Sequence, residues 1–155
     1  MPTMRFEQFG DTVAMVHTAD APSDTEWDAM LAFLRTHWPA RVLVFTEGGG
    51  PTTLQRGRLN DALGKDVMST AVVTSSAVVR GIVTALSWFN PGIKTFSPDG
   101  AAAALRYLGV PAEERHELMR RVSKMSSELK PGGLKCVVWS EQGASSEGGF
   151  DTGAR

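Results

Sequence analysis

The stretch that decides the fold is Arg41-Val42-Leu43-Val44-Phe45-Thr46, followed at once by Glu47-Gly48-Gly49-Gly50-Pro51. The first six residues are a continuous apolar run rather than an alternating one, which is typical of a strand covered on both faces. The glycines and the proline end that strand. Thr52 and Gln55 then have the spacing of a capping box, which predicts a helix to about residue 63. A buried strand that leads through a glycine loop into a helix indicates an α/β domain.

The same alternation continues toward the N-terminus. Residues 5–9 and 13–18 favour strands around the turn Gly10-Asp11, which predicts an antiparallel hairpin. Ser23 and Glu26 form a second capping box, so a helix is expected from there to Pro39.

Toward the C-terminus, strands are predicted at residues 70–74 and 93–96, with helices from 77 to about 89, from Ser97-Pro98, and from Pro111 to about 130. The helix from residue 77 has a wide apolar face that is expected to point inward. Its members are Val78, Val79, Ile82, Val83, Leu86 and Phe89. Strands separated by helices predict right-handed crossovers and a mixed, mainly parallel sheet of four or five strands, with helices on both faces and the hairpin at one edge.

Length and composition fit one globular domain. The chain has 155 residues, of which 42% are hydrophobic and 21% charged. We assign residues 1–130 to the α/β domain and residues 131–155 to a Gly/Ser-rich tail, with at most one short strand at 134–139 and disorder after it.

Charge, hydropathy and cysteine content limit the classes of partner and the cellular location that are expected. The net charge of -1 argues against nucleic-acid binding, although residues 51–100 carry five bases against three acids. The apolar stretch 71–89 is interrupted by polar residues, so a protein integral to a membrane is not expected. One cysteine, Cys136, and no secretory signal predict a cytoplasmic location. Cys136 itself is expected to be a small apolar residue in a terminal strand and not a reactive thiol.

The element order and several segments resemble the SpoIIAA-like branch of the STAS family, the small domains of anti-sigma-factor antagonists and sulphate-transporter tails, some of which are related to lipid-binding Sec14 modules. The segments are Ala71-Val72-Val73-Thr74-Ser75-Ser76, Ala85-Leu86-Ser87-Trp88-Phe89, Ile93-Lys94-Thr95-Phe96 and Ala104-Leu105-Arg106-Tyr107-Leu108. The resemblance implies a STAS-like fold over about residues 4–110 and a regulatory role through protein binding.

In STAS antagonists the loop after the central strand carries Asp-Ser-Ser-Gly, whose phosphorylated serine switches partner binding. The matching place here reads Glu47-Gly48-Gly49-Gly50-Pro51-Thr52-Thr53, without the serine and with a longer loop. Thr52 or Thr53 are the chemical substitutes, because a phosphate there would face the positive end of a helix near Arg56 and Arg58.

The loop at residues 47–53 also has the ingredients of an anion site. Glycines let backbone N–H groups turn toward a ligand, the helix start adds its dipole, and Arg56 and Arg58 supply charge. The loop matches neither a P-loop nor a dinucleotide fingerprint. The alternative, which the sequence favours, is a flexible connection between a strand and a helix with an ordinary cap.

Other candidate residues are weighed individually. Ser75 and Ser76 are interpreted as helix caps rather than nucleophiles. His17, His37 and His116 are isolated, so neither a metal site nor a cofactor is predicted. Arg80 and Trp88 mark a possible interface, because Arg and Trp are enriched at binding hot spots, although a Trp at a helix end often packs under a neighbouring loop.

The sequence therefore favours a non-enzymatic regulatory or interaction module that binds a protein partner through residues 47–58 and the face of Arg80 and Trp88. The alternative is a small-molecule binder, either of a phosphorylated or nucleotide anion at residues 48–53 or of a lipid in an apolar cavity. A homodimer through a sheet edge or the Trp88 face is compatible with both hypotheses.

Overall fold

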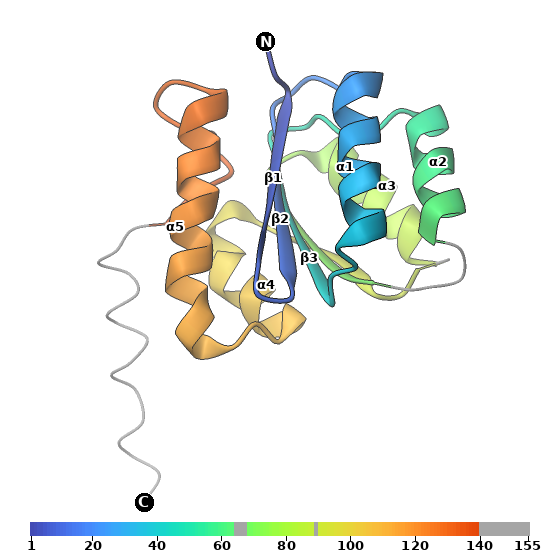
Figure 1. The fold of residues 1–155 in the computed structure, drawn as a ribbon. Helices are drawn as coiled ribbons and strands as arrows, with labels where there is room; N and C mark the ends of the chain where they lie inside the picture. Colours follow the sequence, from blue (N-terminus) through green and yellow to red (C-terminus); the bar gives the residue numbers. More distant parts are fainter. Residues whose placement is uncertain (64–67, 89, 140–155) are drawn as a thin grey trace, which may run out of the picture.

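The fold was analysed in a computed structural model, which describes residues 1–63, 68–88 and 90–139 (Figure 1). In chain order the elements are β1 (Met4–Phe9), β2 (Thr12–His17), α1 (Asp24–Thr36), β3 (Arg41–Thr46), α2 (Thr53–Leu63), β4 (Ser69–Val73), α3 (Ala77–Ser87), β5 (Ile93–Phe96), a 3₁₀ turn (Pro98–Gly100), α4 (Ala101–Leu108) and α5 (Ala112–Leu129).

The five strands form one mixed sheet in the order β1-β2-β3-β4-β5. β1 and β2 are antiparallel, with Met4 opposite His17, whereas each later neighbouring pair is parallel. The structure confirms the predicted α/β class, the edge hairpin and the mainly parallel sheet.

The strand order explains how the helices are distributed. From β2 to β5 the chain adds each new strand on the same side of the last, so right-handed crossovers bring α1, α2 and α3 to one face. α4 and α5 cover the opposite face (Figure 1). The predicted helices on both faces are thus confirmed.

Alternate residues of each strand supply two separate cores. On the α1 side, Val13, Met15 and Val42 pack under Trp27 and Met30. On the other side the core is larger and includes residues of α4, α5 and the segment after α5. Its strand members are Ala14, Val16, Leu43, Phe45, Ala71 and Val73. The sheet is therefore covered on both faces, as the continuous apolar run in β3 predicts.

The helix starts predicted from capping residues are confirmed at α1 and α3. Ser23 and Glu26 form the predicted capping box, and Ser76 accepts a hydrogen bond from the Val79 backbone N–H at 3.3 Å. α3 extends to Ser87, and residue 89 lies outside the described residues. Ser97 precedes a 3₁₀ turn, and its hydroxyl bonds Asp99 instead of capping a helix.

The C-terminal segment differs from its prediction. Residues 131–139 form turns and irregular chain that fold back on α5, so the predicted strand at 134–139 is wrong. Leu134 and Cys136 are buried in the larger core, and the Leu134 N–H donates to the Ser126 hydroxyl at 2.6 Å. Side-chain burial without a strand partner explains the apolar pattern there. The predicted disorder of residues 140–155 concerns residues outside the described part.

Candidate functional site

The carboxyl ends of β2, β3 and β4 lie beside the starts of α1, α2 and α3, which is where α/β sheets commonly hold ligands. The glycine loop that follows β3 lies at this edge. The Gly48 N–H donates to the Thr46 hydroxyl at 3.1 Å, and the Gly49 N–H donates to the Thr18 carbonyl at 2.9 Å. These two N–H groups are thus engaged within the fold.

Two of the glycines are required by the loop's own geometry. Gly48 has a φ of +133°, a region that side chains rarely adopt. Gly49 lies so close to the backbone carbonyls of Thr18 and Asp20 that a Cβ atom would overlap with them. Gly50, in contrast, has open space around it. Gly49 therefore joins the β3–α2 loop to the β2–α1 loop, whereas Gly48 serves the turn of the loop itself.

The predicted capping box at the start of α2 is present. The Gln55 N–H donates to the Thr52 hydroxyl at 3.2 Å, and the Gln55 side-chain carbonyl accepts from the Thr52 N–H at 3.0 Å. Gln55 is only 2% exposed, and its amide also donates to the Pro22 carbonyl at 2.9 Å. The Trp27 indole N–H donates to the Gln55 backbone carbonyl at 2.9 Å. Polar contacts therefore attach α2 to α1.

The two arginines of the predicted site have different surroundings. Arg58 forms salt bridges with Asp24 at 3.0 Å and Asp28 at 2.8 Å on α1. A hydrogen bond from Gln55, and next the charge of Arg58, lower the pKa of Asp24 below its usual value. Arg56 donates to the Thr53 hydroxyl at 3.2 Å. Of the two, Arg56 is the one that the structure places beside the loop's exposed threonines.

Glu47 faces the C-terminal segment, because its carboxylate accepts a hydrogen bond from the Lys135 N–H. Burial, and next the charge of Glu47, raise the pKa of the nearby Cys136 thiol to about 12. Cys136 is 1% exposed, so its thiol is unreactive, as predicted, although it lies in the core and not in a terminal strand. The contact between Glu47 and Lys135 joins residues that no sequence motif links.

A row of buried polar side chains lies beneath the helix starts on the α1–α3 face of the sheet. Its members His17, Thr46 and Thr74 end or follow β2, β3 and β4 and are each at most 3% exposed. Burial lowers the pKa of His17 to about 4, and the Glu26 carboxylate opposes part of that effect. Among the described residues, His17 Nδ1 has no hydrogen-bond partner. In the sequence, His17 was interpreted only as an isolated histidine. Its place in an apolar strand was the one signal that could have indicated its burial.

The largest departure from prediction is on α3. Val78 is 73% exposed and Ile82 41%, whereas Val83 is the helix's buried residue. The inward apolar face predicted for this helix is therefore wrong in large part. α3 packs on β5, the last strand of the sheet, so only the side around Val83 meets the core.

We define the outer face of α3 as Val78, Ile82, Leu86 and Trp88. Leu86 is 36% and Trp88 81% exposed. Between Trp88 and the other three run small residues, Ala77, Gly81 and Ala85, all of them exposed. A Cβ atom built on Gly81 would meet nothing within 4 Å. The outer face thus has two apolar borders and a low middle. Trp88 is placed in the open and not under a neighbouring loop.

Comparisons with protein-family models, with curated proteins and with solved structures give no match to this chain.

A hollow of about 260 Å³ lies between β1 and α5, far from the glycine loop in sequence, and its lining includes Arg5, Glu7 and Glu128. Within residues 1–63, 68–88 and 90–139, there is no helix with the length and hydropathy to cross a bilayer, and no group of three or more metal-ligating side chains.

Proposed function

We propose that this chain is a non-enzymatic, regulatory protein-interaction module of STAS-like fold, and that its partner binds on the outer face of α3. The five-stranded mixed sheet with an edge hairpin supports the resemblance to that family. The observation that carries the proposal is the exposure of Val78, Ile82, Leu86 and Trp88 together on one helix.

Exposed apolar side chains are common singly, but a cluster on one face marks an interaction surface. Tryptophan adds weight, because it is among the residues that contribute most at protein interfaces. The low middle of the face, at Gly81, lets another backbone approach closely. A glycine within a helix costs about 0.5–1 kcal/mol relative to alanine, and no contact inside the described fold requires one at Gly81.

The charge around the outer face indicates the chemistry of the partner. Residues 69–88 include Arg80 and no acidic residue. An apolar face on a helix that carries a cation and no acid suits an amphipathic helix of the partner that has Asp or Glu along the border of its apolar stripe. Arg80 and Trp88, which the sequence predicts to mark an interface, are both exposed, one within α3 and the other at its C-terminal cap.

The experiment uses two matched substitutions. Gly81→Gln fills the middle of the outer face, whereas Gly57→Gln makes the same change on α2, where the space around the Cβ position is also open. Both replace a helical glycine, so both should stabilise the fold by about 0.5 kcal/mol. Proteins retained from native extract by each variant are identified and the purified binders titrated.

The expected result is at least one binder that Gly57→Gln retains with unchanged affinity and that Gly81→Gln binds at least tenfold more weakly. A gain in stability together with a loss of binding cannot arise from damage to the fold. Equal retention of every binder by the two variants would reject the outer face of α3 as the site.

The switch at the glycine loop remains a prediction, and the geometry favours one of its two threonines. Thr52 already uses its hydroxyl as the helix cap, whereas Thr53 is exposed and accepts a hydrogen bond from Arg56. A phosphate on Thr53 would keep that arginine as a counter-charge and would lie at the positive end of α2.

The small-molecule alternative also remains a prediction. The N–H groups of Gly48 and Gly49 and the Arg58 side chain already have partners within the fold. Fewer groups are therefore open to an anion than the sequence suggests. A shift in melting temperature with nucleotides, phosphate or lipids would favour it, because a ligand that binds only the native state raises stability by mass action.

A further inference from the structure

β1 is an edge strand, and no element among the described residues pairs with its outer side. Figure 1 views the sheet from this edge, with α5 on one side and α1 on the other, and no helix passes in front of β1. An exposed edge of this kind is a template for pairing with another strand unless it is blocked.

The register of the hairpin shows which backbone groups point outward. The Thr18 N–H donates to the Thr3 carbonyl, and Met4 lies opposite His17. Because hydrogen-bonded and non-hydrogen-bonded pairs alternate, Arg5, Glu7 and Phe9 direct their backbone groups to β2. Met4, Phe6 and Gln8 therefore direct theirs outward. The Met4 N–H is already bound by Glu26 at 3.2 Å, which leaves Phe6 and Gln8 as the main open positions.

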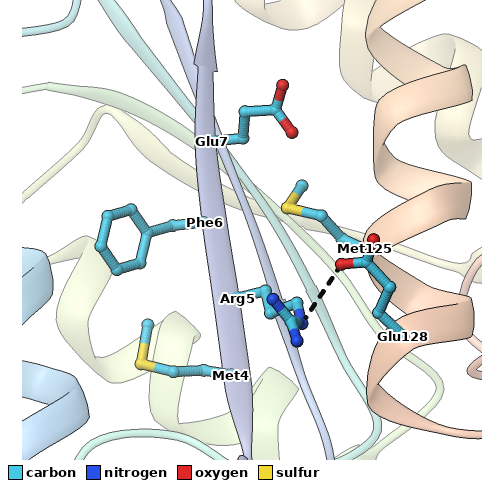
Figure 2. Close-up of a pocket in the computed structure, with 6 residues that line it drawn as sticks. All are labelled: Met4, Arg5, Phe6, Glu7, Met125 and Glu128. Carbon is cyan, nitrogen blue, oxygen red and sulfur yellow. Dashed lines mark ion pairs between the residues drawn. The ribbon is translucent and has the colours of Figure 1, made fainter.

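The side chains along this edge carry alternating charges. Figure 2 shows Arg5 and Glu7 on the α5 side of β1, and Met4 and Phe6 on the opposite side. Arg5 pairs with Glu128 at 3.4 Å, and Glu7 pairs with Arg121 at 2.5 Å. The side chains of Arg5 and Glu7 remain 43% and 41% exposed, so each can accept a second partner.

We propose that β1 pairs antiparallel with β1 of a second copy of this chain, in a register centred on Phe6. The outward groups allow registers centred on Arg5, Phe6 or Glu7. The register centred on Arg5 sets Arg5 opposite Arg5 of the second copy, and the register centred on Glu7 sets Glu7 opposite its equivalent. Both of these registers bring like charges together. The register centred on Phe6 instead sets Arg5 opposite Glu7 of the second copy, twice by symmetry.

The same register extends the ion pairs already present. Glu128, Arg5, Glu7 of the second copy and its Arg121 would form a row of alternating sign on the α5 side. The hollow of about 260 Å³ beside Arg5 and Glu7 gives the incoming side chains room. On the other side, Phe6 would face its own copy. The dimer would leave α3 free, because α3 packs on β5 at the opposite end of the sheet.

The test compares Gln8→Pro with Gln8→Ala. The Gln8 N–H points outward, so proline removes a dimer hydrogen bond and leaves the β1–β2 bonds in place, whereas alanine keeps the N–H. Sedimentation of the full chain over a wide concentration range is expected to show a dimer for the native protein and Gln8→Ala. For Gln8→Pro the dissociation constant should rise at least tenfold.

The register has its own test in cysteine crosslinking. In the centred register Phe6→Cys lies opposite itself, at a Cα separation of about 5.5 Å that a disulfide can span. Gln8→Cys lies opposite Met4, about 13 Å along the strand from its copy. Oxidation should link the first variant and not the second. A native chain that stays monomeric at all concentrations, an unchanged dimer in Gln8→Pro, or crosslinking at position 8 alone would overturn the proposal.

Discussion

α1 and α3 share two sequence signals and differ in what they bury. Both begin at a serine cap and both carry an amphipathic pattern. α1 buries Trp27, Met30, Leu31 and Leu34, whereas α3 buries Val83. The difference lies in position: α1 belongs to the core over β1, β2 and β3, and α3 packs on the edge strand β5. An apolar helix face is thus a stabilising surface at one end of the layer and an available binding surface at the other.

The largest expected effect comes from one substitution made in both helices. Leu31→Ala leaves a cavity in the core and should cost about 2–5 kcal/mol in the free energy of unfolding. Leu86→Ala removes a side chain that is 36% exposed and should cost about 1 kcal/mol or less. Urea denaturation measures both. Equal losses would mean that α3 is packed as α1 is, and the comparison would fail.

The second-largest effect is expected from acid, which should lower the free energy of unfolding through His17, a residue on the α1 face of the sheet. The pKa of His17 is lowered to about 4 in the folded chain, below its value of about 6.5 when unfolded. The unfolded state therefore binds the proton more strongly, so stability is complete above pH 6.5 and falls as the pH decreases toward 4. Linkage gives a loss of about 2 kcal/mol between pH 7 and pH 4.5.

Denaturation of the native chain and of His17→Gln across that range measures the His17 contribution. The variant should show a flatter stability profile, since glutamine does not titrate. Glu26, whose pKa is about 2, contributes mainly below pH 4.5 and leaves this window nearly undisturbed. A profile with the same slope in both proteins would contradict the assignment.

The smallest effect is expected at the exposed salt bridges between α1 and α2. Arg58→Gln breaks the salt bridges to Asp24 and Asp28, but the Arg58 side chain is 42% exposed. Exposed ion pairs contribute about 0–1 kcal/mol, and the loss should shrink further in high salt. Thermal unfolding at low and high ionic strength checks this. A loss of several kcal/mol would show that Arg58, and not buried Gln55, holds α2 to α1.

Local rules predicted much of the fold because they act over a few residues. The capping boxes at Ser23 and Thr52 and the turn at Gly10 fixed element boundaries from side-chain chemistry alone. The exposure of the apolar face of α3 was not predictable in this way, because a helix has the same periodicity over the middle of a sheet and over its edge. Which of the two applies depends on the order of the strands.

The candidate site shows the same limit. The glycine loop was located correctly between β3 and α2, but the partners of its groups come from elsewhere in the chain. Glu47 meets Lys135, and Arg58 meets residues of α1. The strand predicted at 134–139 was wrong because core burial of Leu134 and Cys136 produces an apolar pattern without strand pairing.

The most direct test of the outer face is the reactivity of a thiol placed on it. The native Cys136 is buried and its pKa is raised, so it should not react in the folded chain. Val78→Cys reports on α3, and Ala29→Cys, at an exposed position of α1, is the control. Both should react rapidly with a maleimide in buffer. In native cell extract the proposal predicts that Val78→Cys alone becomes protected; slow reaction in buffer, or equal rates for both thiols in extract, would contradict it.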